Sequence, residues 1–324
     1  MKCAENSKGI GAILKLQTVN FEELIQGKNL DTLDAVCRDW GFFELTHHSI
    51  EKTLREEVLR AMKHFFALSP SEKKKNERTE LNHWGYYDRE LTKNALDWKE
   101  LYDVGPKFGH CIPQWPQHPK EFRPVIEAFA KQCHQVALQL ISGLAQAMTT
   151  NPSQLLNGFD EHTSFLRLNY YPTCEDPAPA STPTGDASKQ LGISHHSDAG
   201  AVTVLMVDGQ DGLQVERDGQ WFTVETNPLS IIINIGDMVQ VWSNDRYTAP
   251  LHRVLASDVE TRYSAPYFLN PSFTTCYAPL DSMCKNEEPR YHEINWGAFR
   301  EGRAAGDYAD VGDEIQIAHY RVVP

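Results

Sequence analysis

One short motif and one distant histidine are the residues of this sequence best suited to hold a metal ion. Of the 13 histidines, only His196 is followed two positions later by an acidic residue, Asp198. On a strand, positions i and i+2 face the same side, so both side chains can reach one ion. His252 stands on a β-prone run further along the chain. Two imidazoles and one carboxylate form the facial triad that binds non-haem Fe(II) and leaves coordination positions open for O2 and a co-substrate.

A second pair of residues, ten positions beyond His252, suits a carboxylate rather than a metal. Arg262 and Ser264 also stand at i and i+2, so they share one face of a strand. A guanidinium fork beside a hydroxyl is a good receptor for a remote carboxylate. Taken alone, Arg262 is explained equally well by a surface ion pair. The combination with the triad is more specific than either part.

The elements that must position these residues change character near residue 160. We expect residues 1–160 to form a mainly helical region that packs on the core, with one long helix over 120–148. Residues 161–324 are expected to form the catalytic core with a helical tail at 296–306, the whole chain being one integrated catalytic unit. Eight short runs in this second part have β propensity: 164–170, 201–207, 213–216, 221–224, 230–235, 238–242, 252–255 and 264–269. Short strands separated by Asp-Gly turns indicate a jelly roll or barrel rather than βαβ units.

Composition and charge exclude several classes of protein. With 324 residues, 41% of them hydrophobic and 23% charged, the composition is that of a globular protein with a substantial core. The net charge of −13 disfavours nucleic acid or an anionic membrane as a partner. No run approaches the ~20 apolar residues of a membrane helix, and residues 1–16 lack a secretory apolar segment. Seven cysteines without C-x-x-C spacing favour a reducing, cytoplasmic setting.

Together, the motifs resemble those of the isopenicillin-N-synthase-like family of Fe(II)/2-oxoglutarate-dependent oxygenases. That family has H-x-D, then a distant histidine, then R-x-S, in the order and spacing found here. The resemblance runs from about residue 15 to the C-terminus. Further matching segments are 40–43 with Leu45 and His48, 169–172, 198–205, 212–215, 234–237, 243–244 and 269–271.

The resemblance implies a mainly β fold with flanking helices, a double-stranded β-helix or jelly roll. It implies that His196, Asp198 and His252 bind Fe(II). The reaction expected of the family consumes O2 and 2-oxoglutarate, releases succinate and CO2, and hydroxylates or desaturates a small organic metabolite. Secondary metabolism is the expected setting, and ascorbate is a candidate reductant.

The resemblance also assigns a binding site for the co-substrate. Arg262 and Ser264 are expected to hold the distal carboxylate of 2-oxoglutarate, with Asn169 and Tyr171 as supporting contacts. Phe268 stands where relatives present an aromatic side chain to the substrate. Ordinary core packing explains Phe268 equally well.

Two other functions are compatible with these residues. An iron-dependent oxidase of the same family would not use 2-oxoglutarate, and R-x-S occurs in such relatives too. A non-catalytic jelly roll that binds a small ligand or a metal would be expected to lack a metal ligand or the arginine, and all are present. The sequence carries no signal for the identity of the substrate, for the position that is oxidised or for the oligomeric state.

Overall fold

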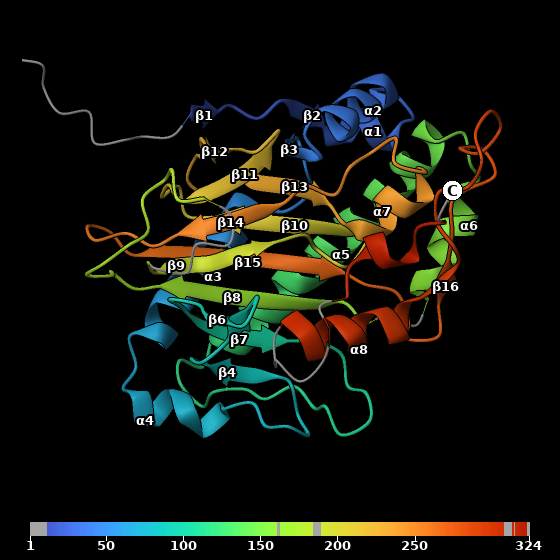
Figure 1. Ribbon diagram of the computed structural model, residues 1–324. Coiled ribbons are helices and arrows are strands. Elements are labelled where there is room, and N and C mark those ends of the chain that lie inside the picture. The colour runs from blue at the N-terminus through green and yellow to red at the C-terminus, as the bar shows by residue number, and fades with distance from the viewer. Residues whose placement is uncertain (1–11, 161–162, 184–188, 308–312, 314, 323–324) are drawn as a thin grey trace, which may run out of the picture.

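Two β-sheets face each other at the centre of the molecule (Figure 1). The computed structural model describes residues 12–160, 163–183, 189–307, 313 and 315–322. The eight strands of the larger sheet are, in spatial order, β2 (Thr18–Asn20), β3 (Phe42–Thr46), β13 (Ile231–Ile235), β10 (Val202–Val207), β15 (Arg262–Leu269), β8 (Phe165–Tyr171), β7 (Glu100–Val104) and β4 (Gly85–Tyr87). The five strands of the smaller sheet are β1 (Ala12–Leu14), β12 (Gln220–Val224), β11 (Leu213–Arg217), β14 (His252–Leu255) and β9 (Leu191–His196).

The second half of the chain crosses repeatedly from one sheet to the other. Strands β8, β10, β13 and β15 belong to the larger sheet, whereas β9, β11, β12 and β14 belong to the smaller one. Sheets built from alternating strands in this way form a jelly roll. The fold therefore confirms the predicted jelly-roll core, and seven of the eight predicted β runs are strands within about two residues of their expected bounds.

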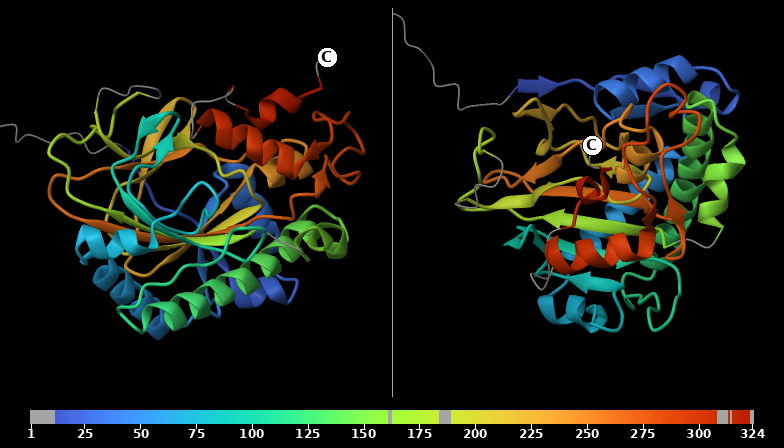
Figure 2. Two further views of the ribbon diagram at one scale, coloured as in Figure 1. Left: turned by 90° about the horizontal axis from the view of Figure 1, so that it is seen from below. Right: turned by 45° about the vertical axis from the view of Figure 1, so that its right-hand side comes forward.

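Helices cover the outer face of the larger sheet (Figure 2). The longest, α5, spans Phe122–Ala147 and confirms the helix predicted over 120–148. Its buried side includes Ile126, Phe129 and Leu140. The helix packs on β10 and β15 and is flanked by α2 and α3. The other helices are α1 (Phe21–Ile25), α2 (Leu30–Asp39), α3 (Lys52–Phe66), α4 (Pro70–Lys73), α6 (Pro152–Leu156), α7 (Asp237–Trp242) and α8 (Trp296–Asp307). The short elements are 3-10 turns at Lys74–Asn76, Asn157–Phe159 and Ile317–Tyr320, and the strand pairs β5 (Leu91–Thr92) with β6 (Ala95–Leu96) and β16 (Cys276–Tyr277) with β17 (Ile294–Asn295).

The prediction of a strand over 238–242 is wrong, because this segment forms helix α7. The chain turns at Gly236, where the backbone N–H groups of Asp237 and Met238 donate to the carbonyls of Asp198 and Gly200 at 2.8 and 3.2 Å. A side chain at position 236 would place its Cβ only 2.2 Å from the Gly200 carbonyl oxygen. The close approach explains the glycine, and it anchors α7 beside the residues that carry the site.

The first 160 residues also contribute to the larger sheet. At one edge β3 pairs with β13 and β2 pairs with β3, and at the other edge β7 and β4 extend the sheet beyond β8. The division into two parts at residue 160 stays a prediction. None of the described helices is long and apolar enough to cross a membrane.

Candidate active site

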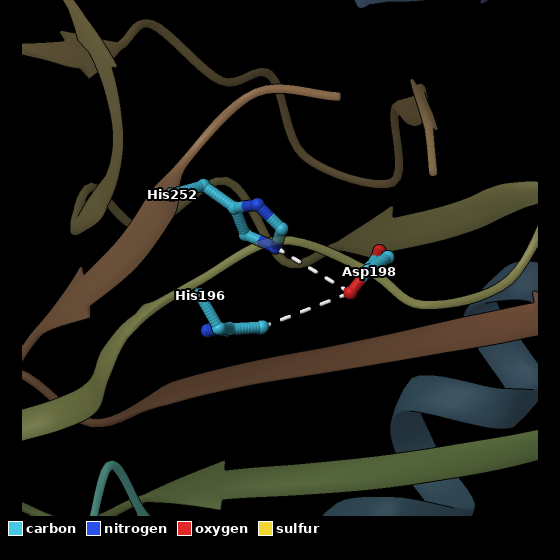
Figure 3. A group of neighbouring side chains, drawn as sticks. All are labelled: His196, Asp198 and His252. Atoms are coloured by element: carbon cyan, nitrogen blue, oxygen red, sulfur yellow. Dashed lines mark ion pairs between the residues drawn. The ribbon is translucent and has the colours of Figure 1, made fainter. Parts of the chain in front are cut away.

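The three expected metal ligands lie side by side (Figure 3). Strands β9 and β14 pair antiparallel, and His196 at the end of β9 is the direct register partner of His252 at the start of β14. The Nε2 atom of each histidine lies 3.8 Å from Oδ1 of Asp198. The three ligand atoms all lie within 4.8 Å of one another. Strand pairing thus brings together residues that are far apart in the sequence.

Asp198 reaches this point from the irregular segment after β9 rather than from a strand. Because β9 ends at His196, the expectation that His196 and Asp198 share one strand face is wrong. The carboxylate is held instead by two hydrogen bonds to its other oxygen, Oδ2. Thr203 donates its hydroxyl at 2.5 Å and Asn234 donates its amide at 2.7 Å. These bonds leave Oδ1 directed at the two histidines.

Backbone carbonyls orient the two imidazoles. Nδ1 of His196 lies 2.9 Å from the Ser194 carbonyl, and Nδ1 of His252 lies 3.1 Å from the Pro250 carbonyl. A hydrogen bond from Nδ1–H to a carbonyl leaves the Nε2 lone pair free for a metal. Burial, together with the neighbouring His252, lowers the pKa of His196 to about 3, so its imidazole is neutral near pH 7.

The carboxylate keeps the charge that a cation needs. Burial alone would raise the pKa of Asp198, but the adjacent His252 and His196 and the hydrogen bonds from Thr203 and Asn234 lower it below its usual range. Imidazole nitrogens and one carboxylate oxygen, converging from one side, are the donor set of non-haem Fe(II) sites. The residues present therefore fit Fe(II).

A buried cation, Arg262, lines the same cavity as the three expected ligands. Arg262 on β15 pairs in register with Tyr171 on β8, and its guanidinium lies 5.1 Å from the centre of the Tyr171 ring. Arg262 is only 4% exposed, yet its Nε and Nη1 have no hydrogen-bond partner among the described residues. An unpaired buried charge is costly, so these donors fit a bound carboxylate. The Asn169 amide lies 3.4 Å from the Ser264 hydroxyl, two register positions along the same two strands.

All eight residues predicted for the site line one cavity of about 890 Å³. Alternation along the strands accounts for this arrangement, since Asn169 and Tyr171 are two apart on β8, and Arg262, Ser264 and Phe268 are an even number apart on β15. Phe42, from the N-terminal part of the chain, packs edge-on against His252 with ring centroids 5.4 Å apart. The His196–Asp198–His252 cluster, the buried Arg262 and Phe268 therefore all line the same cavity.

A network of paired charges, which the sequence analysis did not identify, forms part of the cavity wall. The Arg167 guanidinium on β8 donates to the Glu90 carboxylate at 2.6 and 2.9 Å and to the Asp103 carboxylate at 2.8 Å, in each case through two N–H groups. Lys99 binds Glu90 at 2.8 Å and Asp97 at 2.9 Å. Burial works against the charged form of Lys99, but Asp97 and Glu90 outweigh it and raise the lysine pKa. Charges buried in this way are stable only as a mutually satisfied set.

Arg303, which is also outside the predicted set, connects α8 to the segment that carries two of the expected ligands. Arg303 and Asp237 form a buried ion pair at 2.8 Å, each side chain being at most 2% exposed. The same guanidinium donates to the carbonyl and the hydroxyl of Ser197, at 3.2 and 3.3 Å. Ser197 lies between His196 and Asp198. Asp237 falls in the matching segment 234–237, whereas no sequence pattern distinguishes Arg303 from a surface arginine of the tail helix.

Comparison with known proteins agrees with this geometry. Residues 162–271 match the 2OG-Fe(II) oxygenase superfamily, and residues 15–121 match the N-terminal region described as "non-haem dioxygenase in morphine synthesis N-terminal". Jasmonate-induced oxygenase 4 of Arabidopsis thaliana is 31% identical over 282 residues, which cover 84% of this chain and 77% of the relative. Oxoglutarate-dependent flavonoid 7-O-demethylase 1 of Ocimum basilicum is 32% identical over 268 residues, 80% of this chain and 68% of the relative.

Solved structures share the whole architecture. The structure of JOX2 in complex with 2OG, Fe and JA aligns with a TM-score of 0.79 at 25% identity, covering 97% of this chain and 91% of that one. A full-length Neurospora crassa protein in complex with alpha-KG and thymine aligns with a TM-score of 0.76 at 25% identity, covering 94% and 99%. From motifs, fold and relatives together, the chain belongs to the 2OG-Fe(II) oxygenase superfamily.

Proposed function

We propose that this enzyme, an Fe(II)- and 2-oxoglutarate-dependent dioxygenase, oxidises a small organic metabolite by hydroxylation or desaturation at the cavity described above. One observation carries the assignment of residues. A His-Asp-His cluster and a buried arginine, whose Nε and Nη1 have no partner among the described residues, line the same space. When bound, Fe(II) supplies the activation of O2 that oxidises 2-oxoglutarate to succinate and CO2 and cleaves a substrate C–H bond.

The chain's own residues have three tasks in this proposal. His196, Asp198 and His252 bind the metal, with the carboxylate oriented by its hydrogen bonds. Arg262 and Ser264 bind the distal carboxylate of 2-oxoglutarate, and the geometry of two donors around one carboxylate fixes its direction. The neighbouring Asn169 and Tyr171 limit where that carboxylate can lie.

The supporting contacts and the substrate side complete the proposed site. Asn169 is 1% exposed and its acceptor Oδ1 has no partner among the described residues, which fits a water that links Asn169 to the co-substrate. Phe268 is proposed to contact the substrate. The aromatic and aliphatic lining of the cavity excludes water from the reacting groups.

The observations favour this function over the two alternatives. An oxidase that does not use 2-oxoglutarate is not supported by the relatives, which include one named for oxoglutarate and one structure that holds 2OG and Fe. A non-catalytic jelly roll has no feature in its favour, since every residue of the expected site is present and lines the cavity. Relatives named for a flavonoid and for thebaine support a small metabolite as the substrate.

We further propose that the enzyme acts on free small molecules in the cytoplasm, as one integrated catalytic unit, without nucleic acid or membrane as a partner. The net charge of −13 supports this, and so do the six described cysteines, none of which forms a disulfide. Cys3 lies outside the described residues.

The test is the conversion of 2-oxoglutarate to succinate by the purified protein with Fe(II), O2 and ascorbate, with and without a library of small metabolites. We expect slow succinate formation that the true substrate accelerates, and a loss of at least about 100-fold in Asp198→Ala or His252→Ala, because a lost ligand weakens metal binding. Circular dichroism checks that both variants fold. Near-normal turnover by either variant would remove that residue from the metal site.

A further inference from the structure

Five aromatic side chains form a continuous row along the cavity wall. In order they are Phe268, Phe165, Trp84, Phe108 and Phe273, and all five line the cavity. Successive ring centroids lie 4.9 Å (Phe268 to Phe165), 5.7 Å (Phe165 to Trp84), 5.7 Å (Trp84 to Phe108) and 5.7 Å (Phe108 to Phe273) apart. We call these five residues the aromatic track. They come from separate parts of the chain, so only the folded protein assembles them.

The aromatic track runs from the neighbourhood of the His196–Asp198–His252 cluster to the surface. At its inner end, Phe268 on β15 is the register partner of Thr203 on β10, and Thr203 donates the hydrogen bond that holds Asp198. At its outer end, Phe273 is 41% exposed. A molecule that lies along the track therefore has one end beside the metal ligands and the other near solvent.

The central ring of the track is fixed in place before any ligand arrives. Trp84 is 6% exposed, and its indole N–H donates to the Pro106 carbonyl at 2.9 Å. The indole also lies against the backbone of Gly105, where a Cβ would come within 2.3 Å of the ring atom Cζ2. The glycine thus provides the space that the ring occupies. A ring held in this way is a preformed stacking surface, and preorganisation lowers the entropy lost on binding.

The charges next to the track are already paired with one another. The Arg167 guanidinium lies 5.8 Å from the centre of the Phe165 ring, and it binds both Glu90 and Asp103. The Lys99 ammonium is likewise held by Glu90 and Asp97. A ligand that bound Arg167 or Lys99 would have to replace these ion-pair partners. The track can therefore bind a ligand without breaking these ion pairs.

We propose that the substrate carries a flat, unsaturated or aromatic ring system that stacks on Trp84 and Phe165 and delivers a C–H bond past Phe268 to the metal site. The inference rests on the proposed function and adds the chemical class of the substrate. Aromatic rings gain from offset or edge-to-face contact with other π systems beyond the burial of their area, by roughly three- to tenfold in affinity per pair. A saturated ring of the same size fills the space without that gain.

Matched probes test the proposal. Naphthalene, quinoline, indole and coumarin derivatives are each paired with their fully saturated analogues, and binding to the Mn(II)- and 2-oxoglutarate-loaded protein is measured by calorimetry without O2. We expect at least one flat probe to bind about tenfold more tightly than its saturated analogue. We expect Trp84→Leu and Phe165→Leu to abolish this preference and Trp84→Phe, which keeps a ring, to retain most of it. Phe222→Leu is the matched control. Phe222 belongs to β12 of the smaller sheet, packs on Trp40 and does not line the cavity.

The outcomes separate this proposal from the proposed function. Equal binding of flat and saturated probes, no binding of any flat probe, or a preference that survives in folded Trp84→Leu and Phe165→Leu would each overturn it. The wild-type protein is assayed in parallel for succinate formation from 2-oxoglutarate. Absence of that activity would count against the proposed function itself, whereas normal succinate formation without the ring preference would reject only the substrate class.

Discussion

Asp198 is the residue on which the metal site depends most, because its two carboxylate oxygens have different partners. Oδ1 faces the two imidazoles, and Oδ2 accepts hydrogen bonds from Thr203 and Asn234. These bonds to a charged group are each worth roughly 1.5–3 kcal/mol, which is enough to hold the side chain in one direction before the metal binds. The H-x-D spacing alone does not create the site; the partners of Oδ2 complete it.

A substitution of Arg262 tests the co-substrate end at the same scale. Arg262→Leu removes the charge-assisted hydrogen bonds to the distal carboxylate, so we expect the KM for 2-oxoglutarate to rise by about 100-fold. Arg262→Lys, which keeps the charge but not the planar fork, should give an intermediate value. Arg321→Leu, which removes an exposed arginine bound to Asp245, serves as control and should leave this KM unchanged. An unchanged KM in Arg262→Leu would show that the carboxylate binds elsewhere.

Sequence motifs predict the residues that we propose to bind the metal or the co-substrate, since their types and spacing are dictated by the chemistry. His196, His252 and Arg262 are of this kind. Arg303 is not, because its guanidinium becomes part of the site only through the fold, where α8 packs against the segment that contains Ser197. Thr203 falls in the matching segment 198–205, but its hydrogen bond to Asp198 follows only from its place on β10.

At the scale of elements, strand register does most of the positioning. The antiparallel pairs β9–β14 and β8–β15 set the two histidines opposite each other and Arg262 opposite Tyr171. A slip of one residue would turn every side chain of a strand to its other face. The β-branched and aromatic runs of these strands made most of them predictable. The segment 238–242 was not, because a run this short, with apolar residues on both sides of Gln240, has no period that separates strand from helix.

Helix α8 offers a second test at this scale. Arg303→Gln breaks the buried ion pair with Asp237 and weakens the hold on Ser197, so we expect Mn(II) affinity to fall by about tenfold. Calorimetry with Mn(II) in the absence of O2 measures this directly. Arg303→Lys, which keeps the charge at Asp237, should recover part of the affinity. Arg321→Gln changes an exposed arginine at the C-terminal end and should leave metal binding unaltered. Wild-type affinity in a folded Arg303→Gln variant would limit Arg303 to a structural role.

For the molecule as a whole, a partly buried histidine links folding to pH. Partial burial, assisted by the nearby Arg55, lowers the pKa of His48 to about 4. In the unfolded chain a histidine titrates near 6.5. Between about pH 6.5 and 4 the unfolded state therefore binds protons that the folded state does not, and the free energy of unfolding falls as the pH falls.

The predicted slope is measurable on the metal-free protein. We expect the free energy of unfolding in urea to be lower at pH 5 than at pH 7, by at most about 1 kcal/mol per pH unit from His48, which is only partly buried. His48→Gln should show a shallower dependence on pH. Equal or greater stability at pH 5 would contradict the assignment of His48 as neutral in the folded state.

The central claim is that His196, Asp198, His252 and Arg262 together hold Fe(II) and 2-oxoglutarate. Its most direct measurement is the visible absorption spectrum of the protein with Fe(II) and 2-oxoglutarate in the absence of O2. The account predicts a metal-to-ligand charge-transfer band in the wild type that is lost in Asp198→Ala and needs far more 2-oxoglutarate in Arg262→Leu. A folded, iron-loaded wild-type protein without this band, or an Asp198→Ala variant with the same band, would contradict it.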